Sequence, residues 1–145
     1  MYTIDTDSLE AQEMGGGLSV TFPFSSATGA ADTAAVYLVF EPGGVLPEHT
    51  DSAEEWLLLL ECTVEATVGD ETGILEAGQL ALVPALALHG ARNVGGTRAR
   101  VLGFFGASTN VAHFTDELVP GIRTLVVGAE PGVALPVPTP ESVAA

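Results

Sequence analysis

Two segments of the chain contain residues that can bind a metal ion, and the first of them is short and acidic. Residues 47–55 read Pro-Glu-His-Thr-Asp-Ser-Ala-Glu-Glu, so His49, Asp51 and Glu55 stand at positions of equal parity. On an extended backbone, side chains of equal parity point to the same side. Glu55 also begins the apolar run Trp-Leu-Leu-Leu-Leu, where a carboxylate needs a partner because burying a charge is costly. We therefore expect these three side chains to face one common space.

A second segment, about forty positions later, supplies another imidazole. His89 is followed by Asn93 at a spacing of four, which places both on one side of an extended strand. Two neutral imidazoles and a carboxylate form a common mononuclear metal site with open positions for water, oxygen or substrate. Cys62 is the only cysteine, which excludes an intramolecular disulfide and a cysteine-rich zinc site. The candidate metal ligands are therefore histidines and carboxylates.

Three residues are candidates for moving a proton during a reaction, namely Glu54, Asp51 and His113. Histidines titrate near neutral pH, and carboxylates serve as general acids or bases when suitably placed. A solvated surface charge is the competing interpretation for Glu54, and a surface or core position is the competing one for His113. Asp51 either binds the metal directly or holds a water molecule beside it.

The charge balance excludes several classes of function. The 145-residue chain has 19 acidic residues, four arginines and no lysine, which gives a formal net charge of −15. Such a surface repels the phosphates of nucleic acids and of anionic membranes, so we expect a small-molecule substrate and neither of those partners. The N-terminus lacks the basic and apolar stretches of a secretory signal, and no apolar run is long enough to cross a membrane. We expect a soluble, cytoplasmic protein.

Short β-strands are the elements that would position these residues. Glycine and proline turn signals recur along the chain, and no long amphipathic helix separates the runs between them. The expected strands cover residues 18–23, 35–41, 55–61, 63–68, 73–76, 79–83, 89–94, 98–106, 110–114 and 122–127. Many short strands at this spacing are typical of an antiparallel sandwich or barrel. The fold class predicted is therefore all-β.

The chain divides into three parts. Residues 1–17 form an N-terminal segment in which we expect a short helix over residues 4–14, with Asp5 or Asp7 as its N-cap. Residues 18–128 form one barrel domain. Residues 129–145 carry four prolines and few large apolar groups, so they read as an extended tail. Disorder and an ordered arm on a neighbouring subunit both remain open for that tail.

The run at residues 55–61, Glu-Trp-Leu-Leu-Leu-Leu-Glu, is apolar on both faces. Strands of this kind are usually covered on both sides. One face would line the barrel interior, and the other would meet either a second sheet of the chain or a partner subunit. Both alternatives fit the run, and we expect a homodimer.

The two segments together resemble the paired motifs of the cupin superfamily. The first family motif contains a glycine, a His-x-His pair, a glutamate and a final glycine. Gly43, His49 and Glu55 match it, whereas Asp51 stands at the second histidine and Cys62 at the final glycine. The resemblance implies that His49 and Glu55 are metal ligands and that Asp51 is a fourth ligand with changed chemistry.

The second family motif is matched by Gly78, Pro84, His89 and Asn93, while Leu86 replaces an inner glycine. It implies that His89 is the remaining metal ligand. The resemblance covers roughly residues 34–106 and implies a single antiparallel jelly-roll-like β-barrel.

The residues that differ from the motifs affect which metal ion the site prefers and which backbone conformation the turns can adopt. Aspartate in place of histidine adds a negative charge and hardens the site, so we expect one divalent first-row ion, either Fe, Mn, Ni or Zn. Loss of the turn glycines at Cys62 and Leu86 is tolerable if the backbone φ at those positions is negative.

The resulting hypothesis is a metal-dependent enzyme that acts on a small, largely apolar molecule, aromatic or enolic. The scarcity of lysine and arginine disfavours a phosphorylated substrate, since phosphate recognition usually recruits those residues. The resemblance allows oxygenase chemistry, to which we lean, and equally a redox-neutral cyclase, isomerase or lyase. A non-catalytic small-molecule-binding barrel is the third alternative, and the change at Asp51 is a step towards it.

Overall fold

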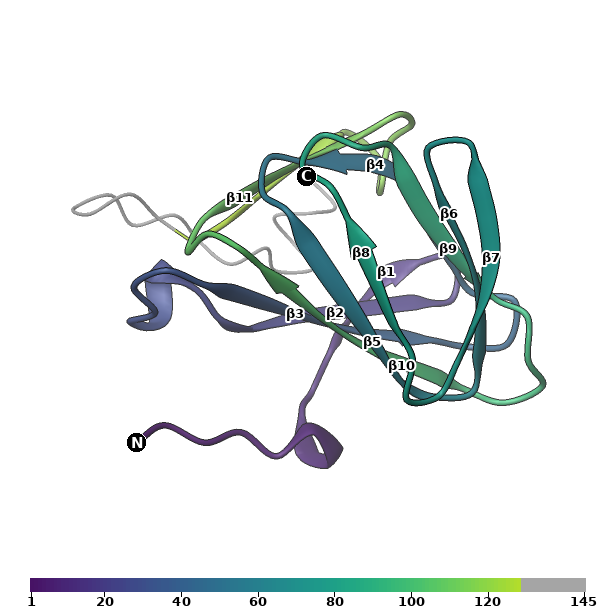
Figure 1. The fold of residues 1–145 in the computed structure, drawn as a ribbon, viewed down its shortest axis with the longest axis horizontal. Coiled ribbons are helices and arrows are strands. Elements are labelled where there is room, and N and C mark those ends of the chain that lie inside the picture. Colours follow the sequence, from purple (N-terminus) through teal and green to yellow (C-terminus); the bar gives the residue numbers. More distant parts are fainter. Residues whose placement is uncertain (129–145) are drawn as a thin grey trace.

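The computed structural model describes residues 1–128, and the expected Pro-rich tail at residues 129–145 lies outside the described residues. Two six-stranded antiparallel sheets face each other and enclose the core (Figure 1). The all-β jelly-roll barrel expected from the strand pattern is confirmed. The first sheet contains, in spatial order, β1 (Gln12–Gly15), β2 (Leu18–Phe24), β3 (Ala34–Phe40), β10 (Ala99–Phe105), β5 (Glu55–Glu61) and β8 (Leu80–Val83).

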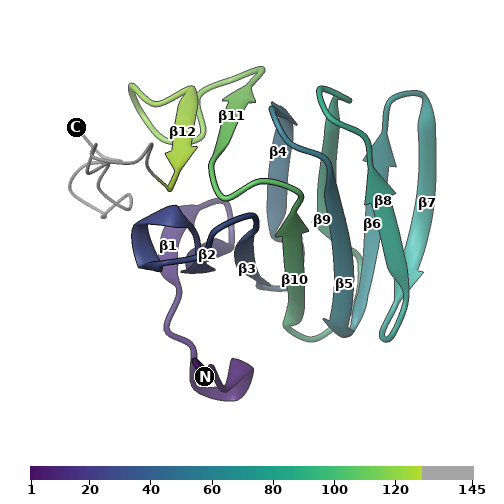
Figure 2. The ribbon, with the colours of Figure 1, turned by 60° about the vertical axis from the view of Figure 1, so that its left-hand side comes forward.

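The second sheet runs from the upper left to the right-hand edge in the view of Figure 2, and it carries most of the candidate ligands. Its spatial order is β12 (Thr124–Val127), β11 (Asn110–Phe114), β4 (Val45–Asp51), β9 (His89–Asn93), β6 (Thr63–Val68) and β7 (Glu71–Glu76). β4 was not among the expected strands, because Val-Leu-Pro-Glu-His-Thr-Asp contains few strand-forming residues. Its pairing with β9 and β11 on either side holds it extended.

The core fills the space between the sheets with alternate residues of each strand. In β10, alternate residues are buried, and those between them are more exposed: the buried ones are Ala99, Val101, Gly103 and Phe105. Phe40 and Leu59 from neighbouring strands of the same sheet are fully buried. The regular alternation follows from the strand repeat of two, which also decides which polar side chains enter the barrel.

The N-terminal segment differs from the expected helix. A 3₁₀ helix forms only over Thr6–Ser8, where Asp5 accepts a hydrogen bond from the Asp7 amide at 2.9 Å. Residues Gln12–Gly15 instead form β1, which pairs with β2. The helix expected over residues 4–14 was therefore too long, because strand pairing outweighed the weak local helix preference. The described helices include none long and apolar enough to span a membrane.

The turns at Cys62 and Leu86, where the cupin motifs have glycine, adopt the backbone conformation that favours glycine. Cys62 has φ 73° and Leu86 has φ 64°, both in the left-handed region. The condition of a negative φ at these positions is thus not met. The left-handed conformation costs a residue with a Cβ about 1–2 kcal/mol. Because both turns adopt it without glycine, the strands that flank each turn must impose its shape.

Asn93 closes the end of the barrel at a turn. Its side-chain amide donates to the carbonyl oxygens of Phe40, Glu41 and Thr97 at 3.2, 3.2 and 2.8 Å. Its own carbonyl accepts from the amide of Gly95 at 2.9 Å. Asn93 is therefore a structural residue that joins the connection after β3 to the connection after β9.

Candidate metal centre

His49 and His89 lie directly opposite each other on the hydrogen-bonded strands β4 and β9. Their ring centroids are 4.1 Å apart. The His49 ring also stacks on the Phe114 ring. Both side chains point into the barrel and are almost fully buried. Asp51, two positions after His49 on β4, points to the same side and is buried as well.

These three residues form a compact group of potential ligand atoms. One ligand atom each from His49, Asp51 and His89 lies within 4.8 Å of the other two. Asp51 Oδ2 is 3.0 Å from His89 Nε2 and 3.5 Å from His49 Nε2. The atoms are close enough to bind one shared ion after small side-chain adjustments.

Both imidazoles are oriented by the backbone. His49 Nδ1 donates to the carbonyl of Pro47 at 2.8 Å, and His89 Nδ1 donates to the carbonyl of Ala87 at 2.9 Å. A carbonyl oxygen only accepts, so Nδ1 carries a hydrogen in each ring and Nε2 is the nitrogen aimed at Asp51. Such a contact on the far nitrogen is the usual way in which metal-binding histidines are held.

Two buried atoms in this group lack a hydrogen bond within the described residues. They are Asp51 Oδ2 and His89 Nε2, which lie 3.0 Å apart but are poorly aligned with each other. Buried polar atoms nearly always have partners, so an unsatisfied pair that converges on one point needs an explanation. A divalent cation between them fits this donor set of imidazole nitrogens and carboxylate oxygens.

The pKa shifts of Asp51 and His89 are consistent with a cation between these two side chains. Burial would raise the pKa of Asp51, but the imidazoles of His49 and His89 hold it below its usual range. Burial would lower the pKa of His89, yet the carboxylates of Asp51 and Glu55 raise it. In the metal-free chain, the protonated His89 ring thus supplies the positive charge that a cation would supply in the loaded site.

Glu55 enters the same space from the other sheet. It begins β5, is almost fully buried, and places Oε1 3.5 Å from His89 Nε2. Burial raises the pKa of Glu55, and the His89 imidazole only partly offsets this effect. Gly103 on β10 makes room for it, because a Cβ there would lie 2.7 Å from Glu55 Oε2. Nothing in the sequence around Gly103 indicated this role.

Asn110 is a buried site residue that sequence reasoning missed. Its side-chain amide donates to Asp51 Oδ1 at 2.7 Å, which leaves Oδ2 turned towards the imidazoles. Its carbonyl accepts from the Ser52 hydroxyl and the Ala53 amide. An asparagine at the start of an apolar strand is uncommon, and this was the available signal.

Glu54 and His113 are not brought to the group. Glu54 is exposed just before β5, one position out of phase with Glu55. His113 is exposed on β11, where it contacts the Thr124 hydroxyl at 3.0 Å, while its neighbours Ala112 and Phe114 face the interior. Asp51 is therefore the only one of the three proton-transfer candidates that lies in the group.

An apolar cavity adjoins the ligand group. The cavity is small, with a volume of about 50 Å³, and it is partly open to solvent. His49, Asp51, Glu55 and Asn110 are its polar lining residues, and neither lysine nor arginine lines it. The apolar lining consists of Leu18, Val20, Phe22, Val36, Leu38, Leu46, Phe105, Ala112, Phe114, Leu118, Leu125 and Val127.

Comparison with known proteins supports the assignment made from the two motifs. A family model described as "Cupin domain" matches residues 36–105. A sequence comparison with curated proteins found no match. Residues 36–105 therefore form a cupin domain, in agreement with both motifs and with the fold.

Several solved structures share the fold at low sequence identity. An oxalate oxidase in complex with the substrate analogue glycolate is 20% identical with a TM-score of 0.67, covering 73% of this chain and 60% of that one. An RmlC-like cupin from Shewanella frigidimarina is 21% identical with a TM-score of 0.61, covering 74% and 91%. An oxalate decarboxylase formate complex from Lactobacillus farciminis is 22% identical with a TM-score of 0.64, covering 70% and 32%. The chain thus spans about 60% of the length of the oxalate oxidase.

Proposed function

We propose that this protein is a metal-dependent cupin enzyme whose ion is held by His49, Asp51 and His89. The observation that carries the proposal is the pair of buried atoms, Asp51 Oδ2 and His89 Nε2, that have no hydrogen bond within the described residues. His49 Nε2 converges on the same carboxylate oxygen. A divalent first-row ion such as Fe, Mn, Ni or Zn suits these ligands.

Glu55 has two roles open to it in this arrangement. It touches the group through His89 and so can complete the ligand set as a fourth ligand. It can also remain unbound and transfer a proton to or from a substrate in the cavity, as a buried carboxyl group with a raised pKa is suited to do. Asp51 is the alternative proton carrier if it does not bind the ion.

The charges of the site favour a neutral substrate. A divalent ion with the carboxylates of Asp51 and Glu55 and two neutral imidazoles has no net charge. No lysine or arginine lines the cavity to attract an anion. Oxalate would bring two negative charges into this space, so oxalate is a poor fit to this site. A small aromatic or enolic molecule fits the apolar lining better.

The reaction to which we lean is an oxygenation. When bound, an ion of this class polarises substrate oxygen atoms or activates dioxygen. The chain itself supplies an apolar lining that excludes water, imidazoles fixed by Pro47 and Ala87, and a carboxyl group at Glu55 for proton transfer. A redox-neutral cyclisation, isomerisation or elimination uses the same residues with Glu55 as the proton carrier. A non-catalytic binding barrel is the remaining alternative.

Metal analysis of protein purified without chelators tests the proposal. We expect about one first-row metal ion per chain in the unmodified protein and strong depletion in His89→Ala. His113→Ala is the matched control, because His113 is an exposed histidine outside the group, and it should retain the metal. Absence of tightly bound metal from the unmodified protein, even after incubation with these ions, would favour the non-catalytic barrel.

Oxygen consumption separates the two enzymatic alternatives. The metal-loaded protein is mixed with a neutral phenol and with a neutral β-diketone as the enolic probe. Consumption of dioxygen that His89→Ala abolishes supports the oxygenase. Conversion of a probe without oxygen uptake supports the redox-neutral reaction.

A further inference from the structure

Strands β7 and β8 lie at the edges of their sheets and leave a groove between them. Within residues 1–128, β7 pairs with β6 alone and β8 pairs with β5 alone. A short turn joins the two strands, and in it the Gln79 amide donates to the Glu76 carbonyl at 3.0 Å. From this turn the strands diverge towards the opposite end of the barrel (Figure 1). The groove, called the edge slot below, has a volume of about 660 Å³ and is partly open to solvent.

Small inward-facing residues create the edge slot. Ala66 on β6 pairs with Gly73 on β7, and both have the parity of the buried Val64. From the other sheet, Ala81 on β8 has the parity of the buried Val83. A Cβ added at Gly73 would meet no atom within 4 Å, so the space in front of it is open. Three positions that face the barrel interior thus carry no group larger than a methyl, and the space between the sheets stays unfilled there.

The lining of the edge slot is apolar except at its open end. Asp70 and Glu71, where the chain turns from β6 into β7, are the two ionisable residues that line it. Glu71 pairs with Val68, which faces the same interior. We propose that the edge slot binds a small apolar molecule that carries a protonated amine. The apolar part lies between the sheets near Gly73, and the ammonium group lies beside Asp70 and Glu71.

Size and shape favour a small molecule as the occupant. Binding sites for small molecules usually have volumes of about 300–1,000 Å³, and the edge slot lies within that range. The cavity beside the metal group, at about 50 Å³, is far smaller. An added β-strand would have to run past both ends of the slot, whereas the turn at Glu76 and Gln79 closes one of them.

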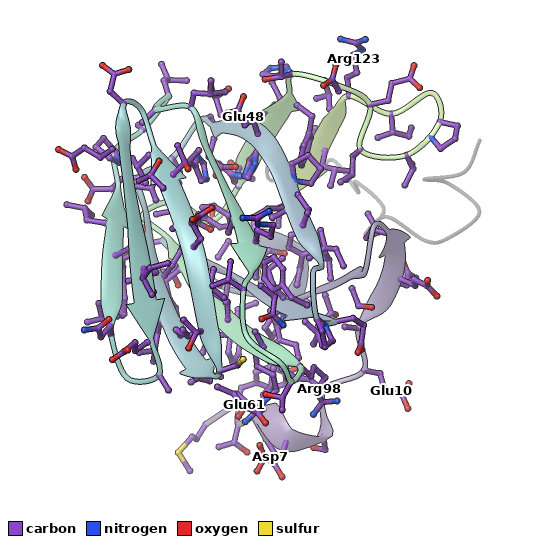
Figure 3. All side chains as sticks on the ribbon, turned by 90° about the vertical axis from the view of Figure 1, so that its right-hand side faces the viewer. Asp7, Glu10, Glu48, Glu61, Arg98 and Arg123 are labelled. Carbon is purple, nitrogen blue, oxygen red and sulfur yellow. The ribbon has the colours of Figure 1, made fainter. Side chains whose placement is uncertain are left out.

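The charges around the edge slot favour a cation over an anion. The chain has no lysine, and none of its four arginines lines the slot. Figure 3 shows Arg98 and Arg123 at opposite ends of the barrel, away from the teal strands at the left. Arg92 and Arg100 pair with acidic residues elsewhere on the surface. The negative field at the mouth attracts an ammonium group and repels both anions and a second copy of this acidic chain.

Three ligands of similar size but different charge test the proposal. They are phenethylamine, phenethyl alcohol and hydrocinnamate, which are positive, neutral and negative at neutral pH. Titration calorimetry of the full-length chain measures their affinities. We expect phenethylamine to bind at least about fivefold more tightly than the alcohol, and hydrocinnamate to bind more weakly than the alcohol. No binding of the amine, or binding of hydrocinnamate as tight as that of the amine, would overturn the proposal.

Gly73→Leu fills the slot and leaves the charge of the chain unchanged. We expect the affinity for phenethylamine to fall at least about tenfold, while thermal unfolding stays cooperative, since the new side chain enters open space on a strand. Gly96→Leu is the matched control, because Gly96 lies in an exposed turn where a Cβ is equally unobstructed, and it should bind like the unmodified chain. Equal binding of the amine by Gly73→Leu would show only a general attraction to an acidic surface and would refute the site.

Glu71→Gln separates the charge contribution from the apolar one. It should weaken phenethylamine binding about fivefold and leave phenethyl alcohol binding unchanged. Glu76→Gln, at the outward parity of the same strand, should change neither. Loss of both ligands in Glu71→Gln, or of neither, would contradict the assigned role of its carboxylate.

The molecular mass of the chain tests the other possible occupant. Light scattering should give the same mass for the unmodified chain and Gly73→Leu. A larger mass for the unmodified chain, lost in Gly73→Leu, would show that a second copy fills the slot and would overturn the proposal.

Discussion

Asp51 has three neighbours that define its place in the site. Asn110 binds Oδ1, while His49 and His89 lie against Oδ2. The cupin motif has a histidine at this position, and the exchange replaces a neutral ligand by a negative one. A divalent ion would then be fully neutralised by Asp51 and Glu55. We infer that this single residue decides whether the site accepts anions.

Removal of that charge should admit an anionic ligand. Because Asp51 is itself a proposed ligand, both proteins are first loaded with excess metal and compared at equal metal content. We then expect Asp51→Asn to bind oxalate at least about tenfold more tightly than the unmodified chain, because one negative charge beside the ion is lost. Titration calorimetry with oxalate measures the change. Asp70→Asn is the control, since it removes an equal charge from an exposed turn between β6 and β7. Equal oxalate affinity in the unmodified chain and Asp51→Asn would contradict the charge argument.

At the scale of elements, the turns beside the ligand strands carry backbone strain. Leu86 lies in the turn between β8 and β9 and combines φ 64° with a side chain that is 69% exposed. Its amide donates to the backbone carbonyl of Asp51 at 2.8 Å, which ties the turn to β4. The hydrogen bond to Asp51 and the adjoining strands hold the turn in this shape, although leucine disfavours a positive φ.

Glycine at this turn should stabilise the protein. Leu86→Gly relieves about 1–2 kcal/mol of strain but adds about 0.5–1 kcal/mol of chain entropy in the unfolded state, so we expect a net gain of about 0.5–1 kcal/mol. Leu88→Gly, at an exposed position of the same turn that has no positive φ, should instead lose about 0.5–1 kcal/mol. Urea unfolding at one fixed protein concentration measures both. A loss of stability in Leu86→Gly would show that its side chain matters more than its backbone.

At the scale of the whole molecule, charge opposes folding. Nineteen acidic residues face four arginines, and folding brings those acids closer together than they are in the unfolded chain. Some local pairs relieve this, such as Arg100 with Asp7. The remaining repulsion acts over distances that dissolved salt screens effectively.

Salt should therefore stabilise the metal-free protein. We expect sodium chloride, raised from low to physiological ionic strength at neutral pH, to add about 1 kcal/mol, or a rise in Tm of about 4 °C for a domain of this size. Thermal unfolding followed by circular dichroism measures the shift. Near pH 4.1, the isoelectric point of the sequence, the net charge vanishes and the same salt should have little effect. An equal shift at both pH values would point to a salt effect unrelated to net charge.

Features that depend on local periodicity could be predicted from the amino-acid sequence. Turn residues and alternation located the strands that carry Glu55 and His89, and equal parity placed His49 with Asp51. Parity also separates Glu55 from Glu54, although both are glutamates and neighbours. Composition alone established the acidic character of the whole chain.

Which strands are neighbours, and in which register they pair, could not be predicted from the sequence and follows from the three-dimensional packing. His49 faces His89 because β4 pairs with β9, and Asn110 reaches Asp51 from 59 positions away. His113 points outward because the register of β11 turns Ala112 and Phe114 into the barrel. These relations depend on packing and hydrogen bonding between segments distant in the chain, whereas periodicity within one segment records only which side a residue faces.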